Sequence, residues 1–315
     1  LAADAAPAAV RGDTYLDQFV DSSVKPGDDF FHYAVGKWLK AHPIPSDERS
    51  WGVGKEVQEE IYARLRKVSD EAASQPLPKG SNQQKIGDFW ASAMDIVAID
   101  KAGFEPLRPE LDRIAAVTDR ETLLATAAHL QYIGVSPLLR VAIMQDAKQS
   151  DVNAVYLWQG GLGLPDRDYY FDDDARTKSV RAEYVKHVAN MLKLLGDDAT
   201  TATAGAATVM RIETDLARAS RKLEDLRDPQ RNYNKMTLDE ATKLTPTVRW
   251  RHFLEESKID HIDSVIVGQP EFLQQLNKTL QKESLADWKA YLRWQLVHEY
   301  ATALSAPFEQ ENFRF

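Results

Sequence analysis

The chain has 315 residues, of which 43% are hydrophobic and 28% charged, and this composition is typical of a folded globular protein with one large core or two ordinary domains. A net charge of -9, with lysine and arginine dispersed along the chain, disfavours nucleic-acid binding, and the lack of cysteine excludes disulfides and thiolate metal sites. No apolar run approaches the roughly 18 to 20 residues that cross a bilayer, so we expect no membrane-spanning segment.

The amino-terminal third of the chain predicts a flexible lead and then helices. Residues 1–13 are rich in alanine and show no periodicity. Asp28 or Asp29 can cap a short aromatic helix, which Pro43 ends because proline cannot continue a helix. From Lys55 onward the apolar residues recur at helical spacing, which predicts a long amphipathic helix.

The rest of the chain is predicted to be helical apart from one β-hairpin near residues 138–158. The segments 138–144 and 152–158 are rich in Val, Ile, Leu and Tyr, and a polar stretch separates them. Aromatic residues at helical spacing, such as Phe89, Trp90 and Trp294, are expected in the core rather than on a ligand platform. The predicted fold class is therefore mainly α, with a small hairpin.

Candidate catalytic and metal-binding motifs are incomplete. His298-Glu299 begins like the zinc signature H-E-x-x-H, but Thr302 stands where the second histidine is needed. The 7 histidines include no pair four residues apart, which excludes a two-histidine zinc site on one helix. The acidic run 172–174 precedes a predicted helix, where capping explains it better than calcium binding. We therefore assign no catalytic residue and no metal ligand to this chain.

Three separated stretches resemble the amino-terminal half of the neprilysin and endothelin-converting-enzyme family of zinc metallopeptidases. They are Lys25–Leu39 (KPGDDFFHYAVGKWL), Gly163–Tyr170 (GLPDRDYY) and Arg227–Thr237 (RDPQRNYNKMT). Their order and wide spacing are similar to those of the family, so the resemblance covers nearly the whole chain. The lack of cysteine is closer to a bacterial-type member than to the disulfide-rich animal enzymes.

The resemblance implies a two-lobed, mainly helical enzyme that encloses a substrate chamber. Its zinc would be held by H-E-x-x-H and a further Glu in a carboxy-terminal half, which this sequence does not contain. In the family mechanism, zinc polarises the scissile carbonyl and its bound water while the motif Glu takes the proton. The chain would then be the non-catalytic half of a zinc metalloendopeptidase, inactive alone, with the catalytic half as its partner and peptides as substrates.

The resemblance also suggests one substrate-binding residue. In neprilysin, an arginine directly before an aromatic-Gly pair grips the terminal carboxylate of the peptide, as a planar guanidinium can. Here the pair is Trp51-Gly52, but Ser50 precedes it and Arg49 stands one position earlier. Arg49 is thus the candidate anchor, and a solvated loop arginine is the alternative.

The expected division of the chain follows from the same resemblance. Residues 1–54 would pack against the catalytic lobe, residues 55–300 would form the helical lobe that covers the chamber, and residues 301–315 would lead into the missing half. The start of the chain, which has no initiator methionine, suggests an exported protein, periplasmic or secreted.

The rival function is a helical peptide-binding or protein-interaction module without catalysis. A helical glycosidase is a third alternative, suggested only by the tryptophans and carboxylates.

Overall fold

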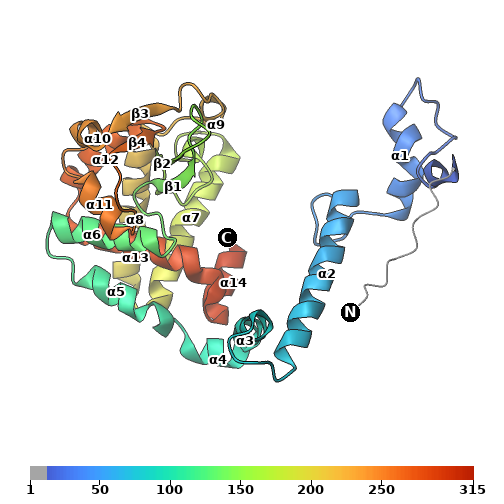
Figure 1. Cartoon of the computed structure of the whole chain (residues 1–315), viewed down its shortest axis with the longest axis horizontal. Coiled ribbons are helices and arrows are strands. Elements are labelled where there is room, and N and C mark those ends of the chain that lie inside the picture. Colours follow the sequence, from blue (N-terminus) through green and yellow to red (C-terminus); the bar gives the residue numbers. More distant parts are fainter. Residues whose placement is uncertain (1–12) are drawn as a thin grey trace. The chain divides into compact units, whose positions relative to one another are not determined.

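The computed structural model describes residues 13–315 and divides into two compact units. The small unit extends to Met94 and the large unit covers Asp95–Phe315 (Figure 1). All but the last residue of the predicted lead at residues 1–13 lies outside the described residues. The predicted division of roles at residues 54 and 300 concerns contacts with a catalytic lobe, and it stays a prediction.

The small unit is helical. Its elements are η1 (Asp13–Gln18), α1 (Phe30–Ala41), α2 (Val53–Ala73) and α3 (Asn82–Met94). Asp29 caps α1 as predicted, because its carboxylate accepts the backbone N–H of His32 at 3.0 Å. Helices α2 and α3 pack closely at Gly87, where a Cβ would lie only 2.4 Å from the carbonyl oxygen of Ala72.

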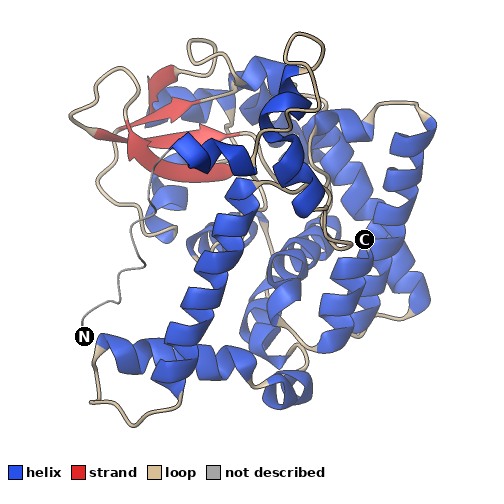
Figure 2. Cartoon of the chain, turned by 90° about the vertical axis from the view of Figure 1, so that its right-hand side faces the viewer, coloured by secondary structure: helices blue, strands red, loops and turns tan. Residues whose placement is uncertain are grey.

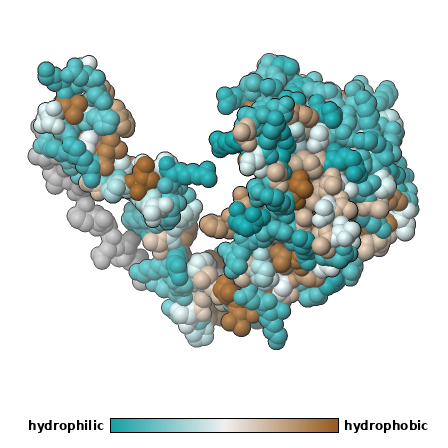
Figure 3. All heavy atoms as spheres, turned by 180° about the vertical axis from the view of Figure 1, so that it is seen from behind, coloured by the Kyte–Doolittle hydropathy of each residue, from teal (hydrophilic) through white to brown (hydrophobic). Residues whose placement is uncertain are grey.

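The small unit leaves many apolar side chains exposed. Phe89, which we expected in a core, is 77% exposed, and α2 has no buried residue. The prediction was wrong for Phe89 because helical spacing identifies an apolar face but not the element that covers it. Figure 3 shows such hydrophobic residues as brown patches on the surface.

The large unit contains most of the secondary structure. Its elements in chain order are α4 (Ile96–Ala102), η2 (Glu105–Leu107), α5 (Arg108–Ala115), α6 (Arg120–Tyr132), β1 (Arg140–Gln145), β2 (Asn153–Trp158), η3 (Arg167–Tyr170), α7 (Ala175–Leu194), α8 (Ala199–Ala217), α9 (Leu223–Leu226), β3 (Asn234–Thr237), α10 (Leu238–Leu244), α11 (Trp250–Glu256), β4 (Ser264–Val267), α12 (Pro270–Lys282), α13 (Leu285–Tyr300), η4 (Ala301–Ala303) and α14 (Ala306–Arg314). The mainly helical fold is confirmed. Asp174 caps α7 by accepting the N–H of Thr177, the role predicted for the acidic run.

The predicted hairpin is present but belongs to a larger sheet. The strand order is β1-β2-β4-β3, with β2 and β4 parallel and the other two pairs antiparallel (Figure 2). The expectation of a lone hairpin was wrong because β3 and β4 have only four residues each, too few for strand alternation to be recognised. One face of the sheet, with Val155, Leu157 and Val265, joins the core that the helices build.

Helices α7, α8 and α13 pack together at the centre of the large unit. Trp288 and Trp294 of α13 are fully buried, so Trp294 occupies the core as predicted. The hydroxyl of Tyr291 lies 2.6 Å from the carbonyl oxygens of both Pro137 and Gly161, which share its one proton. This one side chain therefore ties α13 to the segments before β1 and after β2.

A buried carboxylate lies inside this core. Glu213 of α8 accepts hydrogen bonds from the hydroxyls of Tyr170 and Tyr184, both at 2.8 Å, and from the Trp294 indole at 3.3 Å. Its side chain is fully buried, and burial raises the pKa of Glu213 to about 7 although these hydrogen bonds favour the charged form. Glu213 thus joins η3, α7, α8 and α13 through one polar centre.

Candidate functional site

Two adjoining cavities lie in the large unit around the sheet. The smaller, here called the sheet cavity, has a volume of about 390 Å³, and the larger, the loop cavity, about 660 Å³. Both are lined by Arg140, Gln159 and Leu226. The loop cavity is bounded further by residues 160–167 and by His298 and Glu299 of α13.

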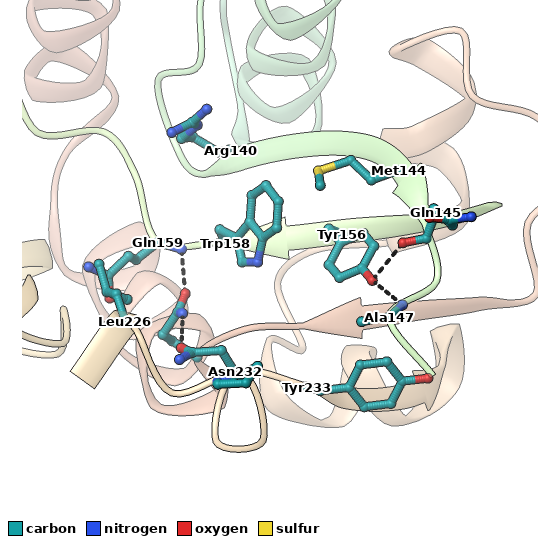
Figure 4. Close-up of a pocket in the computed structure, with 12 residues that line it drawn as sticks. Arg140, Met144, Gln145, Ala147, Tyr156, Trp158, Gln159, Leu226, Asn232 and Tyr233 are labelled. Atoms are coloured by element: carbon teal, nitrogen blue, oxygen red, sulfur yellow. Dashed lines mark hydrogen bonds between the residues drawn. The ribbon is translucent and has the colours of Figure 1, made fainter. Parts of the chain in front are cut away.

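The walls of the sheet cavity come from the face of the sheet that is turned away from the helical core. Arg140 pairs with Trp158 in the β1–β2 register, and Met144 and Tyr156 follow on the same face because side chains alternate along a strand. Figure 4 shows these side chains along the two strands, with Tyr233 facing them from the loop before β3. The cavity is thus lined mainly by aromatic and aliphatic groups.

Two glycines allow this wall to form. A Cβ at Gly268 would lie 2.4 Å from Cδ1 of Trp158, so the indole lies directly against the Gly268 backbone. A Cβ at Gly160 would lie 2.9 Å from the backbone nitrogen of Arg140. Both contacts are shorter than van der Waals distance, so any larger residue would displace Trp158 or the start of β1.

A network of hydrogen-bonded amide side chains lies between the two cavities. Gln269 accepts the backbone N–H of Gln159 at 2.9 Å and donates to the Asn232 side chain at 2.7 Å. The amide of Gln159 donates to the carbonyl oxygen of Arg221 and accepts from its N–H. The network joins the end of β2, the loop before β3 and the start of α12, and Figure 4 shows its central bonds.

A buried aspartate, Asp146, lies between Gln145 and Ala147, which line the sheet cavity. Asp146 accepts hydrogen bonds from the backbone N–H of Lys148 at 2.9 Å, the Lys235 ammonium at 2.9 Å and the Tyr233 hydroxyl at 2.8 Å. The backbone bond and the lysine stabilise the ionised form, which lowers the pKa of Asp146 to about 2. The Lys148 ammonium lies 4.4 Å from the centre of the Tyr233 ring.

Two of the three arginines that line the loop cavity are already paired. Arg167 forms an ion pair with Asp168 at 2.8 Å, and Arg221 makes a two-pronged ion pair with Glu271 at 2.5 and 3.0 Å. Burial lowers the pKa of His298 to about 4, so its imidazole is neutral at neutral pH. The cavity therefore offers polar groups for binding but no nucleophile paired with a base.

Arg140 differs from the other two arginines. Its side chain is exposed and makes no hydrogen bond or ion pair with any other residue of the large unit, Asp95–Phe315. Among the described residues that line the sheet cavity, it is the only one that carries a charge. A free guanidinium thus stands beside an aromatic wall.

The stretches identified in the sequence divide between the two units. Gly163–Tyr170 and Arg227–Thr237 both contribute to the cavities of the large unit, which brings together residues far apart in the sequence. Lys25–Leu39 and Arg49 lie in the small unit, where Arg49 is exposed in the segment between α1 and α2. Its contact with a substrate stays a prediction.

No cluster of three or more His, Asp or Glu side chains suited to a metal ion occurs within residues 13–315. His298 and Glu299 do line the loop cavity, but Thr302 follows in η4 and no second histidine completes the signature. In the same described part of the chain, no helix combines the length and apolarity that a membrane span requires.

Comparison with known proteins decides the family. A family model described as peptidase family M13 matches residues 26–315. The chain belongs to peptidase family M13. Endothelin-converting enzyme 1 of Mus musculus is 26% identical over 310 residues, and endothelin-converting enzyme-like 1 of Rattus norvegicus is 27% identical over 321 residues. These alignments cover 94% and 96% of this chain but only 39% and 41% of the relatives.

Solved structures agree with this assignment. The Mycobacterium tuberculosis zinc metalloprotease Zmp1 in complex with an inhibitor matches with a TM-score of 0.87 and 29% identity, covering 95% of this chain and 46% of that one. PepO of Lactobacillus rhamnosis matches the fold with a TM-score of 0.75 at 19% identity, over 92% of this chain and 46% of its own. The M13 chain described here therefore spans less than half the length of the relatives it matches, and it corresponds to their amino-terminal domain.

Sequence reasoning missed most residues of the two cavities. The amides of Gln159 and Gln269 belong to no recognised motif, and Asn232 was identified only as part of the stretch Arg227–Thr237. The proximity of these three residues depends on the parallel pairing of β2 with β4. The richness of residues 152–158 in Val, Leu and Tyr predicted the strand. The period of two along any strand could then have placed Tyr156 and Trp158 on one face. Arg140 carried no signal, because an arginine at the start of a strand is common on protein surfaces.

Proposed function

We propose that this chain is the non-catalytic amino-terminal half of a zinc metalloendopeptidase, in which it encloses a substrate chamber and limits cleavage to peptides. The observation that carries the proposal is the family match over residues 26–315, together with the position of two family-like stretches at the cavities. Folded proteins would be refused because a closed chamber excludes them sterically, while short peptides enter. Export to the periplasm or the exterior belongs to the same proposal.

The described residues do not fit a catalytic zinc site. Such a site needs three protein ligands and an open position, and residues 13–315 present no cluster of that kind. In the proposed enzyme a carboxy-terminal half would hold the metal and supply Lewis-acid chemistry. The residues described here would bind and orient the peptide and keep water from it, without touching the scissile bond.

Reconstitution tests this proposal. The isolated 315-residue chain is expected to bind no stoichiometric zinc and to leave a fluorogenic peptide uncleaved, whereas adding the matching carboxy-terminal half restores both. Metal analysis and the peptide assay measure the two outcomes. Zinc-dependent cleavage by the isolated chain would overturn the proposal. No cleavage after the halves associate would also count against it and would leave a peptide-binding module without catalysis.

The same assay examines Arg49 as the carboxylate anchor. In the reconstituted enzyme, Arg49→Ala should weaken peptides with a free carboxy terminus by about 1.5 to 3 kcal/mol, the range of a charge-assisted hydrogen bond. Amidated peptides should be unaffected. Equal losses for both peptide forms would assign Arg49 a structural role only.

A further inference from the structure

We propose that the sheet cavity, with Arg140 at its mouth, is a peptide subsite that binds a large apolar side chain against Trp158 and a neighbouring carboxylate at Arg140. The choice of a peptide as occupant rests on the proposed function. That the ligand carries a large apolar group and an anionic group is inferred from the cavity itself.

The first argument is charge. Arg140 makes no ion pair within the described residues, whereas Arg167 and Arg221 of the loop cavity are paired with Asp168 and Glu271. At the opposite end of the sheet cavity, Lys235 is held by Asp146 at 2.9 Å. A free guanidinium presents planar, two-pronged donors that match a carboxylate. An incoming anion therefore finds its free partner at Arg140.

The second argument is shape. The rings of Trp158 and Tyr156 lie side by side along β2, with centroids 5.2 Å apart and planes inclined by 37°. Leu226, Pro229 and Tyr233 also line the cavity. A volume of about 390 Å³ lies within the range of ligand pockets, roughly 300 to 1,000 Å³. Because Arg140 and Trp158 are register partners on adjacent strands, the cation and the indole lie on the same face.

The third argument is pre-organisation. The backbone of Gly268 supports the Trp158 ring, and hydrogen bonds among Gln159, Gln269 and Asn232 fix the side chains between this cavity and the loop cavity. A ligand would thus meet a wall that is already ordered, which lowers the entropic cost of binding. Glu299 is exposed and lines only the loop cavity, so it does not compete for Arg140 inside the sheet cavity.

The carboxylate can come from two sources, the free carboxy terminus of a peptide or an acidic side chain next to the apolar residue. Three probes separate them: N-acetyl-alanyl-alanyl-phenylalanine as the free acid, the same peptide as its amide, and the amide with glutamate before phenylalanine. Calorimetric titration of the intact 315-residue chain measures each dissociation constant. The free acid, the glutamate peptide or both should bind more tightly than the neutral amide.

Variants then locate the contacts. Arg140→Gln should weaken the carboxylate-bearing probes about tenfold, equivalent to about 1.4 kcal/mol, and leave the neutral amide unchanged. Arg140→Lys should recover part of that loss, because it keeps the charge but not the two-pronged geometry. Trp158→Leu should weaken all three probes. Arg176→Gln is the matched control, since Arg176 is an exposed arginine on α7 outside both cavities.

Three results would overturn the proposal: no binding of any probe at millimolar concentration, equal binding of all three, or equal losses from Arg140→Gln and Arg176→Gln. Circular dichroism of each variant confirms that the fold is retained. The test needs no catalytic half, so its outcome is separate from the reconstitution. If the probes bind but the reconstituted halves do not hydrolyse peptides, the subsite is supported and the proposed function is rejected. If the halves hydrolyse peptides but the probes do not bind, the proposed function is supported and the subsite is rejected.

Discussion

Helices α2 and α8 are nearly equal in length, with 21 and 19 residues, yet their surroundings differ completely. No residue of α2 is buried, whereas nine residues of α8 are. On α2, Ile61 and Leu65 are 49% and 57% exposed, while Ile212 and Leu216 of α8 are fully buried. Both helices show apolar residues at helical spacing. The comparison teaches that periodicity identifies the face of a helix but not what covers it.

The largest expected effect concerns the carboxylate on α8. Glu213→Ala should lower the free energy of unfolding of the large unit by about 4 kcal/mol, because the buried hydroxyls of Tyr170 and Tyr184 lose their acceptor and a cavity forms. Chemical denaturation followed by tryptophan fluorescence measures it, since Trp294 contacts the same carboxylate. Glu59→Ala on the exposed surface of α2 is the control and should change little. Similar losses of unfolding free energy in both variants would contradict the difference in burial between α8 and α2.

Leucine truncation makes the comparison with identical chemistry. Leu216→Ala should cost about 3 kcal/mol of unfolding free energy, the usual range for a fully buried leucine. Leu65→Ala should cost less than about 1 kcal/mol, because its side chain already meets solvent. Denaturant titration of both variants gives the two values. A cost for Leu65→Ala as large as that for Leu216→Ala would mean that α2 is covered in solution.

Glu213 alone should also produce a pH dependence of the unfolding free energy. Because burial raises its folded pKa to about 7, the folded state binds more protons than the unfolded state between about pH 4.5 and 7. Its contribution to stability is present at low pH and is lost as pH rises through 7, with a slope of at most about 1.4 kcal/mol per pH unit.

Glu213→Gln should abolish that slope, as unfolding free energies measured from pH 5 to 8 would reveal. The unfolding free energy of the variant must be subtracted from that of the wild type, because the contribution of His298 to stability changes with pH in the opposite direction. Burial lowers its pKa to about 4, so its contribution grows as pH rises from 4 to about 6.5. Parallel pH profiles for the two proteins would show that Glu213 stays ionised throughout.

Much of the fold was predictable because helices depend on local patterns. The cap at Asp29, the cap in the run ending at Asp174 and the hairpin near residues 138–158 were all confirmed. Strands β3 and β4 were not predicted, because Asn234–Thr237 has no alternation of apolar residues and Ser264–Val267 is too short to be distinguished from a buried helical turn.

The candidate site was less predictable than the fold. Resemblance identified the stretches at residues 163–170 and 227–237, but their sequences do not indicate that both lie at the sheet. That meeting depends on tertiary contacts such as the hydrogen bond between Gln159 and Gln269. An unpaired arginine is likewise invisible in a sequence, because pairing is a property of neighbours in space. Arg140 could be recognised only after the structure supplied its surroundings.

The parallel pairing of β2 with β4 has a consequence for how this protein is made. The chain between these strands includes α7, α8 and α11, so the pairing joins residues of very large sequence separation. Contacts of this kind form late, because the entropy of closing a long loop must be overcome first. The ribosome also completes β1 and β2 well before β4 is synthesised. Until then the hairpin has an unpaired edge and Trp158 lacks the backbone of Gly268 beneath it, which exposes this hairpin to wrong pairing during synthesis.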